Sequence, residues 1–324
     1  MPEKRIAITM GDPAGIGPEI ILKTLNCGDF DPRRIVLIAN TEIMSMYSDK
    51  LGLKLPSEQE IIDIPFDVSK ITPRVESAQS GELSYLALEK ACAMANSGQV
   101  NAIVTAPLSK NAINKAGYKF SGQTEILEKL TGKQGKNKAE MLFVAGDFKV
   151  MLLTRHIPFA DVSKSLNKEK IIESVRVLHT SLREDFKIEH PKIALCGLNP
   201  HAGEGGLIGS EEITVLIPAM NELKELGIDI EGAFPADMLF AKAARAYLNG
   251  QKQPYDCYLA CYHDQGLIPI KSLAVDKTVN TTIGLPVIRT SPAHGTAFDI
   301  AGSGKADFNS MCEAVKLAFE LSGF

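Results

Sequence analysis

The sequence predicts an α/β protein with largely parallel sheets and enough chain for two lobes. Short apolar runs rich in β-branched residues alternate with amphipathic segments from end to end, a pattern typical of strands covered on both faces by helices. The 324 residues exceed the roughly 250 to 300 at which a single core stops growing. Hydrophobic residues make up 45% and charged residues 23%, which is ordinary for a globular protein.

Seven apolar runs are expected to form strands. Several are short and unbroken, which favours a strand buried on both faces over one that faces water on one side. The expected strands are residues 5–10, 35–39, 102–105, 141–144, 150–154, 192–197 and 257–262.

Five amphipathic segments between these runs are expected to form helices, over residues 18–25, 83–95, 169–183, 211–226 and 235–247. Pro18 and Pro235 stand where the first turn of a helix tolerates proline. Ser210 precedes Glu211 and Glu212, and a capping hydroxyl before acidic residues indicates a helix start. There is neither a low-complexity linker nor an internal repeat, so two lobes would share a broad hinge.

Charge and cysteine usage exclude several classes of protein. The net charge is -4 without a basic block, so no nucleic-acid partner is expected. No apolar run is long enough for a membrane span or a secretory signal. Six scattered cysteines favour reduced thiols in a cytoplasmic enzyme. Cys257 and Cys261 stand near His263, but four strand residues span about 13 Å, so we interpret them as core residues.

Four of the six histidines stand in polar surroundings after predicted strands or in a glycine-rich loop: His156, His201, His263 and His294. Ligands of an open α/β sheet bind at the carboxyl ends of its strands, where the first three would meet. Three neutral imidazoles are a normal ligand set for a catalytic divalent ion. The carboxylates of Asp237 and Asp264 are candidates to orient these rings. His179 and His190 are interpreted as surface residues.

The stretch Gly-Asp-Pro-Ala-Gly-Ile-Gly-Pro-Glu over residues 11–19 follows the first strand and opens a helix. It lacks the third glycine of a dinucleotide-binding fingerprint and the Gly-Lys-Ser/Thr ending of a P-loop. Its backbone N–H groups at a helix start suit an anion, and a purely structural turn is an equal alternative.

Further polar residues suit an anionic substrate. Lys271, Asn280 and Arg289 follow His263, and an ammonium, an amide and a guanidinium bind phosphate and carboxylate groups. Gln123 and Thr124 are expected to add a polar wall. Singly, each of these side chains would be read as a surface residue.

Taken together, the motifs resemble the 4-hydroxythreonine-4-phosphate dehydrogenase family of pyridoxal phosphate biosynthesis. The motifs are Ile-Thr-Met-Gly-Asp-Pro-Ala-Gly-Ile-Gly-Pro-Glu, Thr-Ala-Pro-Leu-Ser-Lys, Leu-Asn-Pro-His-Ala-Gly-Glu-Gly-Gly, Pro-Ala-Asp, Tyr-His-Asp-Gln-Gly and Arg-Thr-Ser-Pro-Ala-His-Gly-Thr-Ala. They run in the family's order from residue 5 to the C-terminus. D-threonate and D-erythronate 4-phosphate dehydrogenases share nearly all of them.

The resemblance implies two α/β/α lobes of the isocitrate and isopropylmalate dehydrogenase type, with an active-site cleft between them and a homodimer with shared active sites. The first lobe is expected to comprise residues 1–123 and 286–324, and the second residues 124–285. The resemblance also implies NAD bound without a Rossmann fingerprint, with NADP left open. The cofactor-binding residues would be His294, Gly295, Thr296 and Asp299.

The resemblance also assigns roles in the site. The ligands of a divalent ion (Zn, Co, Mn or Mg) would be His156, His201 and, from the partner subunit, His263. The substrate contacts would be Thr124, Lys271, Asn280 and Arg289. The family commonly has Gly-His-Thr-Glu where this chain has Gly-Gln-Thr-Glu over residues 122–125. Glutamine at position 123 still forms hydrogen bonds but carries no charge, so this difference concerns the choice of substrate and not the type of reaction.

The implied reaction is oxidation of a secondary alcohol of a phosphorylated hydroxy acid, followed by decarboxylation when the substrate is 4-phosphohydroxy-L-threonine. Candidates for the catalytic base are Lys271, Asp237 and Asp264. The first alternative is D-threonate or D-erythronate 4-phosphate as substrate. A metallohydrolase with a three-histidine ion and a non-catalytic phosphometabolite-binding protein are more remote alternatives. No membrane partner is expected.

Overall fold

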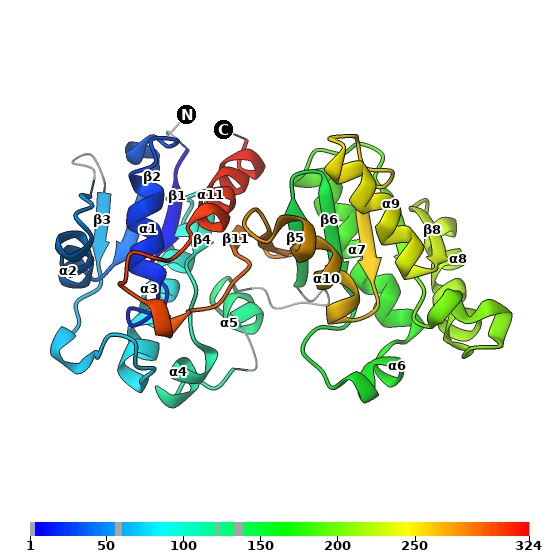
Figure 1. The fold of residues 1–324 in the computed structure, drawn as a ribbon, viewed down its shortest axis with the longest axis horizontal. Helices are drawn as coiled ribbons and strands as arrows, with labels where there is room; N and C mark the ends of the chain where they lie inside the picture. The colour runs from blue at the N-terminus through cyan, green and yellow to red at the C-terminus, as the bar shows by residue number, and fades with distance from the viewer. Residues whose placement is uncertain (1–3, 56–59, 121–122, 133–138, 324) are drawn as a thin grey trace. The chain divides into compact units, whose positions relative to one another are not determined.

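The computed structural model describes residues 4–55, 60–120, 123–132 and 139–323. The chain forms two compact units, the first from Met1–Gln134 with Leu285–Phe324 and the second from Gly135–Gly284 (Figure 1). The α/β fold class is confirmed. The lobe boundaries that we expect after residues 123 and 285 remain a prediction.

The first unit is built on a parallel sheet with the strand order β3-β2-β1-β4-β11. Its strands are β1 (Ile6–Thr9), β2 (Ile35–Ala39), β3 (Glu60–Asp63), β4 (Ala102–Thr105) and β11 (Ile288–Pro292). All residues of β1, β2 and β4 are buried, which explains their unbroken apolar sequences.

Helices cover this sheet. The α-helices are α1 (Gly17–Leu25), α2 (Thr41–Leu51), α3 (Ala78–Asn96), α4 (Lys110–Lys115), α5 (Gln123–Leu130) and α11 (Asn309–Leu321), with 3-10 turns η1 (Pro32–Arg34), η2 (Val68–Lys70) and η6 (Phe298–Ile300). The apolar face of α3 packs on Ala7, Val36 and Ile103 of three neighbouring strands. The helix α11 contacts β11 and α1.

The second unit is built on a mixed sheet with the strand order β10-β5-β6-β9-β7-β8. Its strands are β5 (Glu140–Ala145), β6 (Phe148–Leu152), β7 (Lys192–Cys196), β8 (Asp229–Phe234), β9 (Cys257–Ala260) and β10 (Val279–Ile283). The pairs β6–β9, β9–β7 and β7–β8 are parallel, whereas β5 runs antiparallel to both of its neighbours. Four parallel strands therefore end at one edge of this sheet, in the order β6-β9-β7-β8.

The helices of the second unit are α6 (Val162–Ser165), α7 (Lys168–Glu184), α8 (Ile217–Glu225), α9 (Ala236–Leu248) and α10 (His263–Ala274). The turns are η3 (Phe159–Asp161), η4 (Pro200–Gly206) and the π-helical η5 (Glu212–Leu216). No helix in the described ranges has the length and apolar character of a membrane span.

All seven expected strands are confirmed to within a few residues. The structure contains four further strands that were not predicted, β3, β8, β10 and β11. His263 follows β9, as expected, and begins helix α10. One local expectation is wrong. Ser210 does not cap the segment after it, because the π-helical turn has Glu211 at its N-cap position without a side-chain cap.

Candidate active site

Three predicted ion ligands follow three neighbouring strands of the second unit. His156 follows β6, His263 follows β9 and His201 follows β7, and β9 pairs with both β6 and β7. Carboxyl ends of parallel strands at one sheet edge are the usual position for a ligand site in an α/β protein. The fold therefore directs all three chain segments to the same edge.

Two of these histidines lie side by side in a single chain. The ring centroids of His156 and His263 are 5.3 Å apart, with an interplanar angle of 47°. The Nδ1 atom of His263 lies 2.7 Å from Oδ1 of Asp264. Because a carboxylate accepts the Nδ1 proton, the tautomer leaves Nε2 available to a metal ion. The donor chemistry of this pair fits a divalent ion.

His201 lies on a run of left-handed backbone. His201, Ala202, Gly203, Glu204 and Gly205 have φ angles of 53°, 53°, 76°, 43° and 67°. Three of these five residues are not glycine, and each such residue in the left-handed region costs about 1–2 kcal/mol. Strain of this kind concentrates at functional sites.

The third ligand does not complete a cluster within one chain. Over the described residues, no group of three or more His, Cys, Asp or Glu side chains is placed to hold a metal ion. His156 and His263 therefore form a pair, and His201 lies outside it. The resemblance assigns His156 and His201 to one subunit. The pair observed in a single chain is instead His156 with His263.

The remaining predicted residues of the second unit lie on α9, α10 and β10. Lys271 lies two turns after His263 on α10, and partial burial lowers the pKa of its ammonium group. Asn280 lies on β10, where its Oδ1 atom is buried and lacks a hydrogen-bond partner among the described residues. A buried acceptor in this condition fits a ligand that donates a hydrogen bond. Asp237 is exposed in the first turn of α9.

In the first unit, Arg289, Thr105 and Gln123 form a second polar cluster. The guanidinium of Arg289 donates to Thr105 Oγ1 from Nε at 3.1 Å and from Nη2 at 2.6 Å. Gln123 Nε2 donates to the same hydroxyl at 3.0 Å. Arg289 is buried, and desolvation lowers the pKa of its guanidinium to about 9. An anionic ligand would raise this pKa again, because a nearby negative charge favours the cation.

Thr105 is the member of this cluster that the sequence reasoning did not single out. It ends β4 and is fully buried, so as a β-branched strand residue it resembles a core position. Its place in the Thr-Ala-Pro-Leu-Ser-Lys motif, directly at a strand end, was the signal. Thr124, the residue after Gln123, lies half-buried on α5, and its role as a substrate contact stays a prediction.

The glycine-rich turn before α1 packs against the loop that contains His294. Ile16 N donates to Thr296 O at 2.9 Å. A Cβ atom on Gly15 would lie 2.8 Å from the same oxygen, so only glycine permits this approach. Asp12, in the same turn, is buried, and its burial raises the pKa of its carboxyl to about 6. The turn thus supports the predicted cofactor loop.

The far end of the loop is anchored to α1. Glu19 Oε1 accepts from Ala306 N at 2.9 Å, and Lys23 Nζ donates to Ala306 O at 2.7 Å. His294, Gly295 and Asp299 remain exposed on this anchored loop. An ordered backbone that presents an imidazole and a carboxylate to solvent fits the adenosine part of a dinucleotide.

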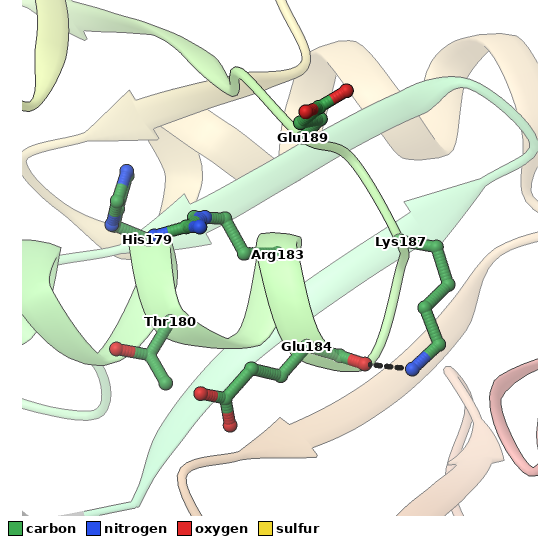
Figure 2. Close-up of a pocket in the computed structure, with 6 residues that line it drawn as sticks. All are labelled: His179, Thr180, Arg183, Glu184, Lys187 and Glu189. Carbon is green, nitrogen blue, oxygen red and sulfur yellow. Dashed lines mark hydrogen bonds between the residues drawn. The ribbon is translucent and has the colours of Figure 1, made fainter.

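A pocket of about 360 Å³ at the end of α7 contains none of the predicted residues. Figure 2 shows its lining, where Lys187 Nζ donates to Glu184 O at 2.6 Å. The lining residues are His179, Thr180, Arg183, Glu184, Lys187 and Glu189. Cations and carboxylates alternate around it, so it selects no charge class. The candidate site is therefore identified by the chemistry of its side chains and not by this pocket.

The architecture is that of the isocitrate dehydrogenase fold. A solved isocitrate dehydrogenase from Methylococcus capsulatus aligns with a TM-score of 0.50 at 16% identity, covering 99% of this chain and 86% of that chain. This likeness concerns the fold alone. The predicted fold type is confirmed.

The chain belongs to the family described as pyridoxal phosphate biosynthetic protein PdxA, whose sequence model matches residues 22–318. It is 43% identical to 4-hydroxythreonine-4-phosphate dehydrogenase of Thermosynechococcus vestitus over 98% of this chain and 96% of that protein. It is 39% identical to D-threonate 4-phosphate dehydrogenase of Pectobacterium atrosepticum over 98% and 99%. The solved 4-hydroxythreonine-4-phosphate dehydrogenase of Klebsiella pneumoniae aligns with a TM-score of 0.87 at 36% identity, covering 100% and 99%. The predicted family is confirmed.

Proposed function

We propose that this protein is a 4-hydroxythreonine-4-phosphate dehydrogenase. It would oxidise the secondary alcohol of 4-phosphohydroxy-L-threonine with NAD, with loss of CO2, in the synthesis of pyridoxal 5'-phosphate. Relatives that match nearly the whole chain have this name. The structural observation that carries the proposal is the buried guanidinium of Arg289 beside Thr105 and Gln123, because burial favours the binding of an anion there.

We propose His156, His201 and His263 as ligands of one divalent ion per site, zinc, cobalt, manganese or magnesium. The pairing of two imidazoles and the Asp264 contact support this assignment. When bound, such an ion lowers the pKa of a coordinated hydroxyl and stabilises negative charge on oxygen. Three imidazoles favour the borderline ions, zinc and cobalt, over magnesium.

Among the three candidate bases, Lys271 is the one that the structure supports best. Partial burial lowers the pKa of its ammonium group, and a lysine with a lowered pKa is a more effective base near neutral pH. Asp264 already accepts a hydrogen bond from His263, which favours a role in orienting that ring. Asp237 lies in the first turn of α9, where a carboxylate stabilises the helix dipole.

We propose that the loop with His294, Gly295, Thr296 and Asp299 binds the cofactor. Its anchoring by Ile16 and by α1 supports this assignment. An exposed carboxylate such as that of Asp299 accepts hydrogen bonds from ribose hydroxyls and repels a 2′-phosphate, which favours NAD over NADP. NADP remains the alternative cofactor to be measured alongside.

We propose a homodimer in which partner residues complete each ion site. The pair of His156 and His263, beside which the described residues of one chain place no third ligand, supports this proposal. So does a set of exposed apolar side chains in the second unit, which carries the histidines. These are Phe159 at 76%, Leu207 at 83%, Met238 at 57% and Ile268 at 63% exposure. In the proposed dimer, the partner subunit would cover these side chains.

A cytoplasmic location is proposed with the homodimer. All six cysteines are free thiols, and thiols stay reduced in the cytosol.

D-threonate 4-phosphate is the alternative substrate, because a D-threonate 4-phosphate dehydrogenase covers the chain equally well. Gln123 replaces the family's usual histidine beside the Arg289 cluster. A panel of 4-phosphorylated hydroxy acids, with and without the amino group, would rank the two by kcat/KM.

The test of the whole proposal is NADH formation, followed at 340 nm, with 4-phosphohydroxy-L-threonine, NAD and a divalent ion. Exhaustive chelation should abolish the activity and an added ion should restore it. Full activity of a protein shown by metal analysis to be empty would overturn the three-histidine assignment. The absence of NADH formation with any phosphorylated acid of the panel would overturn the dehydrogenase.

A further inference from the structure

Arg74 lies between the glycine-rich turn before α1 and the loop that contains His294. Its backbone N donates to Ala14 O at 2.9 Å, and its guanidinium Nε donates to Ala301 O at 2.9 Å. The first contact reaches the turn, and the second reaches the proposed cofactor loop. Arg74 therefore touches both of the segments that the first unit brings together at this site.

The backbone of Arg74 is strained. Its φ angle is 69°, in the left-handed region that glycine adopts freely and other residues avoid. The contact with Ala14 comes from the backbone, so a glycine would form it without strain. The side chain adds a hydrogen bond to Ala301, and the net stabilisation from one such bond does not exceed the cost of the strain. Stability alone thus gives no reason for an arginine here, and strain of this kind indicates a function.

Lys50, in the last turn of α2, brings a second cation to the same loop. A Cβ atom on Gly302, the residue after Ala301, would lie 3.1 Å from Lys50 Nζ. Lys50 and Arg74 are both exposed. Over the described ranges, neither the ammonium of Lys50 nor the Nη atoms of Arg74 have a hydrogen-bond or ion-pair partner. Two cations with open donors therefore adjoin consecutive residues of the proposed cofactor loop.

Tyr47, one turn before Lys50 on α2, packs this helix against the same two segments. Its buried Oη atom donates to Gly15 O at 3.3 Å, in the glycine-rich turn. Its ring atom Cε1 lies 3.4 Å from the position that a Cβ atom on Gly302 would take. Lys50 therefore projects from a helix that is already fixed against the turn and the loop, which reduces the entropy lost when its ammonium binds a ligand.

We propose that Arg74 and Lys50 bind the diphosphate of the cofactor. A guanidinium binds two phosphate oxygens at once, and an ammonium binds phosphate as a point charge. This inference rests on the proposed function, in which the loop with His294 and Asp299 binds the adenosine part of NAD. The carboxylate of Asp299 repels a 2′-phosphate, so the diphosphate is the anion that agrees with both the cations and this carboxylate.

The test separates binding of the phosphates from binding of the adenosine. NADH bound to the full-length protein is followed by its fluorescence, and adenosine, 5′-AMP, ADP and 2′-AMP are titrated as competitors. The variants are Arg74→Gly, which removes both the guanidinium and the strain, and Lys50→Met. The matched control is Lys187→Gly in the second unit. Lys187 is also an exposed cation with a left-handed φ, of 57°, and its side chain donates to a backbone carbonyl, Glu184 O at 2.6 Å.

We expect Arg74→Gly to bind NADH and ADP about tenfold to a hundredfold more weakly than the wild type, as for the loss of one charge-assisted hydrogen bond to an anion. Lys50→Met should weaken both by a smaller factor, because an ammonium lacks the fork of a guanidinium. Adenosine has no phosphate and should compete equally well in the wild type and both variants. Lys187→Gly should bind every competitor as the wild type does. If Arg74 only supports the loop, adenosine and ADP weaken by the same factor, and the proposal is wrong.

A His294→Ala variant separates the two possible failures. If it binds NADH and adenosine as tightly as the wild type, the proposed cofactor loop is wrong, and with it the role of the two cations. If it binds both more weakly while Arg74→Gly and Lys50→Met bind ADP normally, the loop stands and the phosphate role is wrong. Weakening of 2′-AMP without weakening of ADP would also overturn the proposal, because the cations would then bind a 2′-phosphate. Should Arg74→Gly not fold, Lys50→Met decides the test, since it breaks no hydrogen bond among the described residues.

Discussion

Replacing Arg289 by methionine should separate anion binding from stability. Desolvation lowers the pKa of the guanidinium from 12.5 to about 9, and at about 1.36 kcal/mol per unit the charged form is disfavoured by roughly 5 kcal/mol. Methionine removes this cost and also the two hydrogen bonds to Thr105, each worth about 1.5–3 kcal/mol. The two effects nearly cancel, so the free energy of unfolding should change by no more than about 2 kcal/mol.

For the binding of a phosphorylated acid, no saved desolvation cost offsets the hydrogen bond that the variant loses. Loss of one charge-assisted hydrogen bond to an anion costs about 1.5–3 kcal/mol, so kcat/KM should fall roughly tenfold to a hundredfold. The Arg289→Lys variant keeps a charge but loses the planar fork, and should lie between the wild type and Arg289→Met. NAD affinity, measured by titration, should stay at the wild-type value.

The assay follows NADH at 340 nm with the phosphorylated acid varied at saturating NAD, and urea denaturation gives the stability. A fall in NAD affinity by the same factor as kcat/KM would show that Arg289 supports the fold as a whole. So would a loss of several kcal/mol of stability in Arg289→Met. In either case the Arg289 cluster is not the anion site.

Three further predictions concern substrate, subunit arrangement and pH. Gln123→His should raise the preference for 4-phosphohydroxy-L-threonine over D-threonate 4-phosphate, and an unchanged ratio of kcat/KM would make this position neutral. Inactive His156→Ala and His263→Ala homodimers, unfolded and refolded together, should recover about a quarter of wild-type activity if partner subunits supply these residues, and none if both ligands come from one chain. Because partial burial lowers the pKa of Lys271, its neutral form is present above that lowered pKa. A base role therefore predicts that kcat/KM rises with pH through it, a rise that Lys271→Arg should move to higher pH or abolish.

The buried strands were predictable because burial on both faces leaves a continuous apolar sequence. The strands β1, β2 and β4 have no exposed residue, and each was found from its sequence. The edge strand β3 has no buried residue, and β10 reads Val-Asn-Thr-Thr-Ile. The strands were predicted from unbroken apolar runs. Neither β3 nor β10 contains such a run, so neither was predicted.

The sequence indicated which histidines follow strands and led us to expect that three of them meet, but it did not indicate that His156 and His263 lie side by side in one chain. Strand order decides this, and β9 lies between β6 and β7 although it follows both in the chain. That insertion brings His263 beside His156, more than a hundred residues earlier. Long-range pairing of this kind leaves no periodicity in a single sequence. The same holds for Thr105, whose contact with Arg289 spans 184 positions.

The turn that contains His201 shows what local rules miss at a functional site. Asn-Pro-His-Ala-Gly-Glu-Gly-Gly has the composition of a turn or loop, and three non-glycine residues in it adopt left-handed backbone. The surrounding structure must hold such a conformation, since each residue costs about 1–2 kcal/mol. A Cβ atom on Gly203 would lie 2.6 Å from Glu212 Oε2, and Glu212 also binds Asn199. The buried carboxylate of Glu212 and the strained turn thus fit one another closely, and their contact helps to fix the backbone that presents His201.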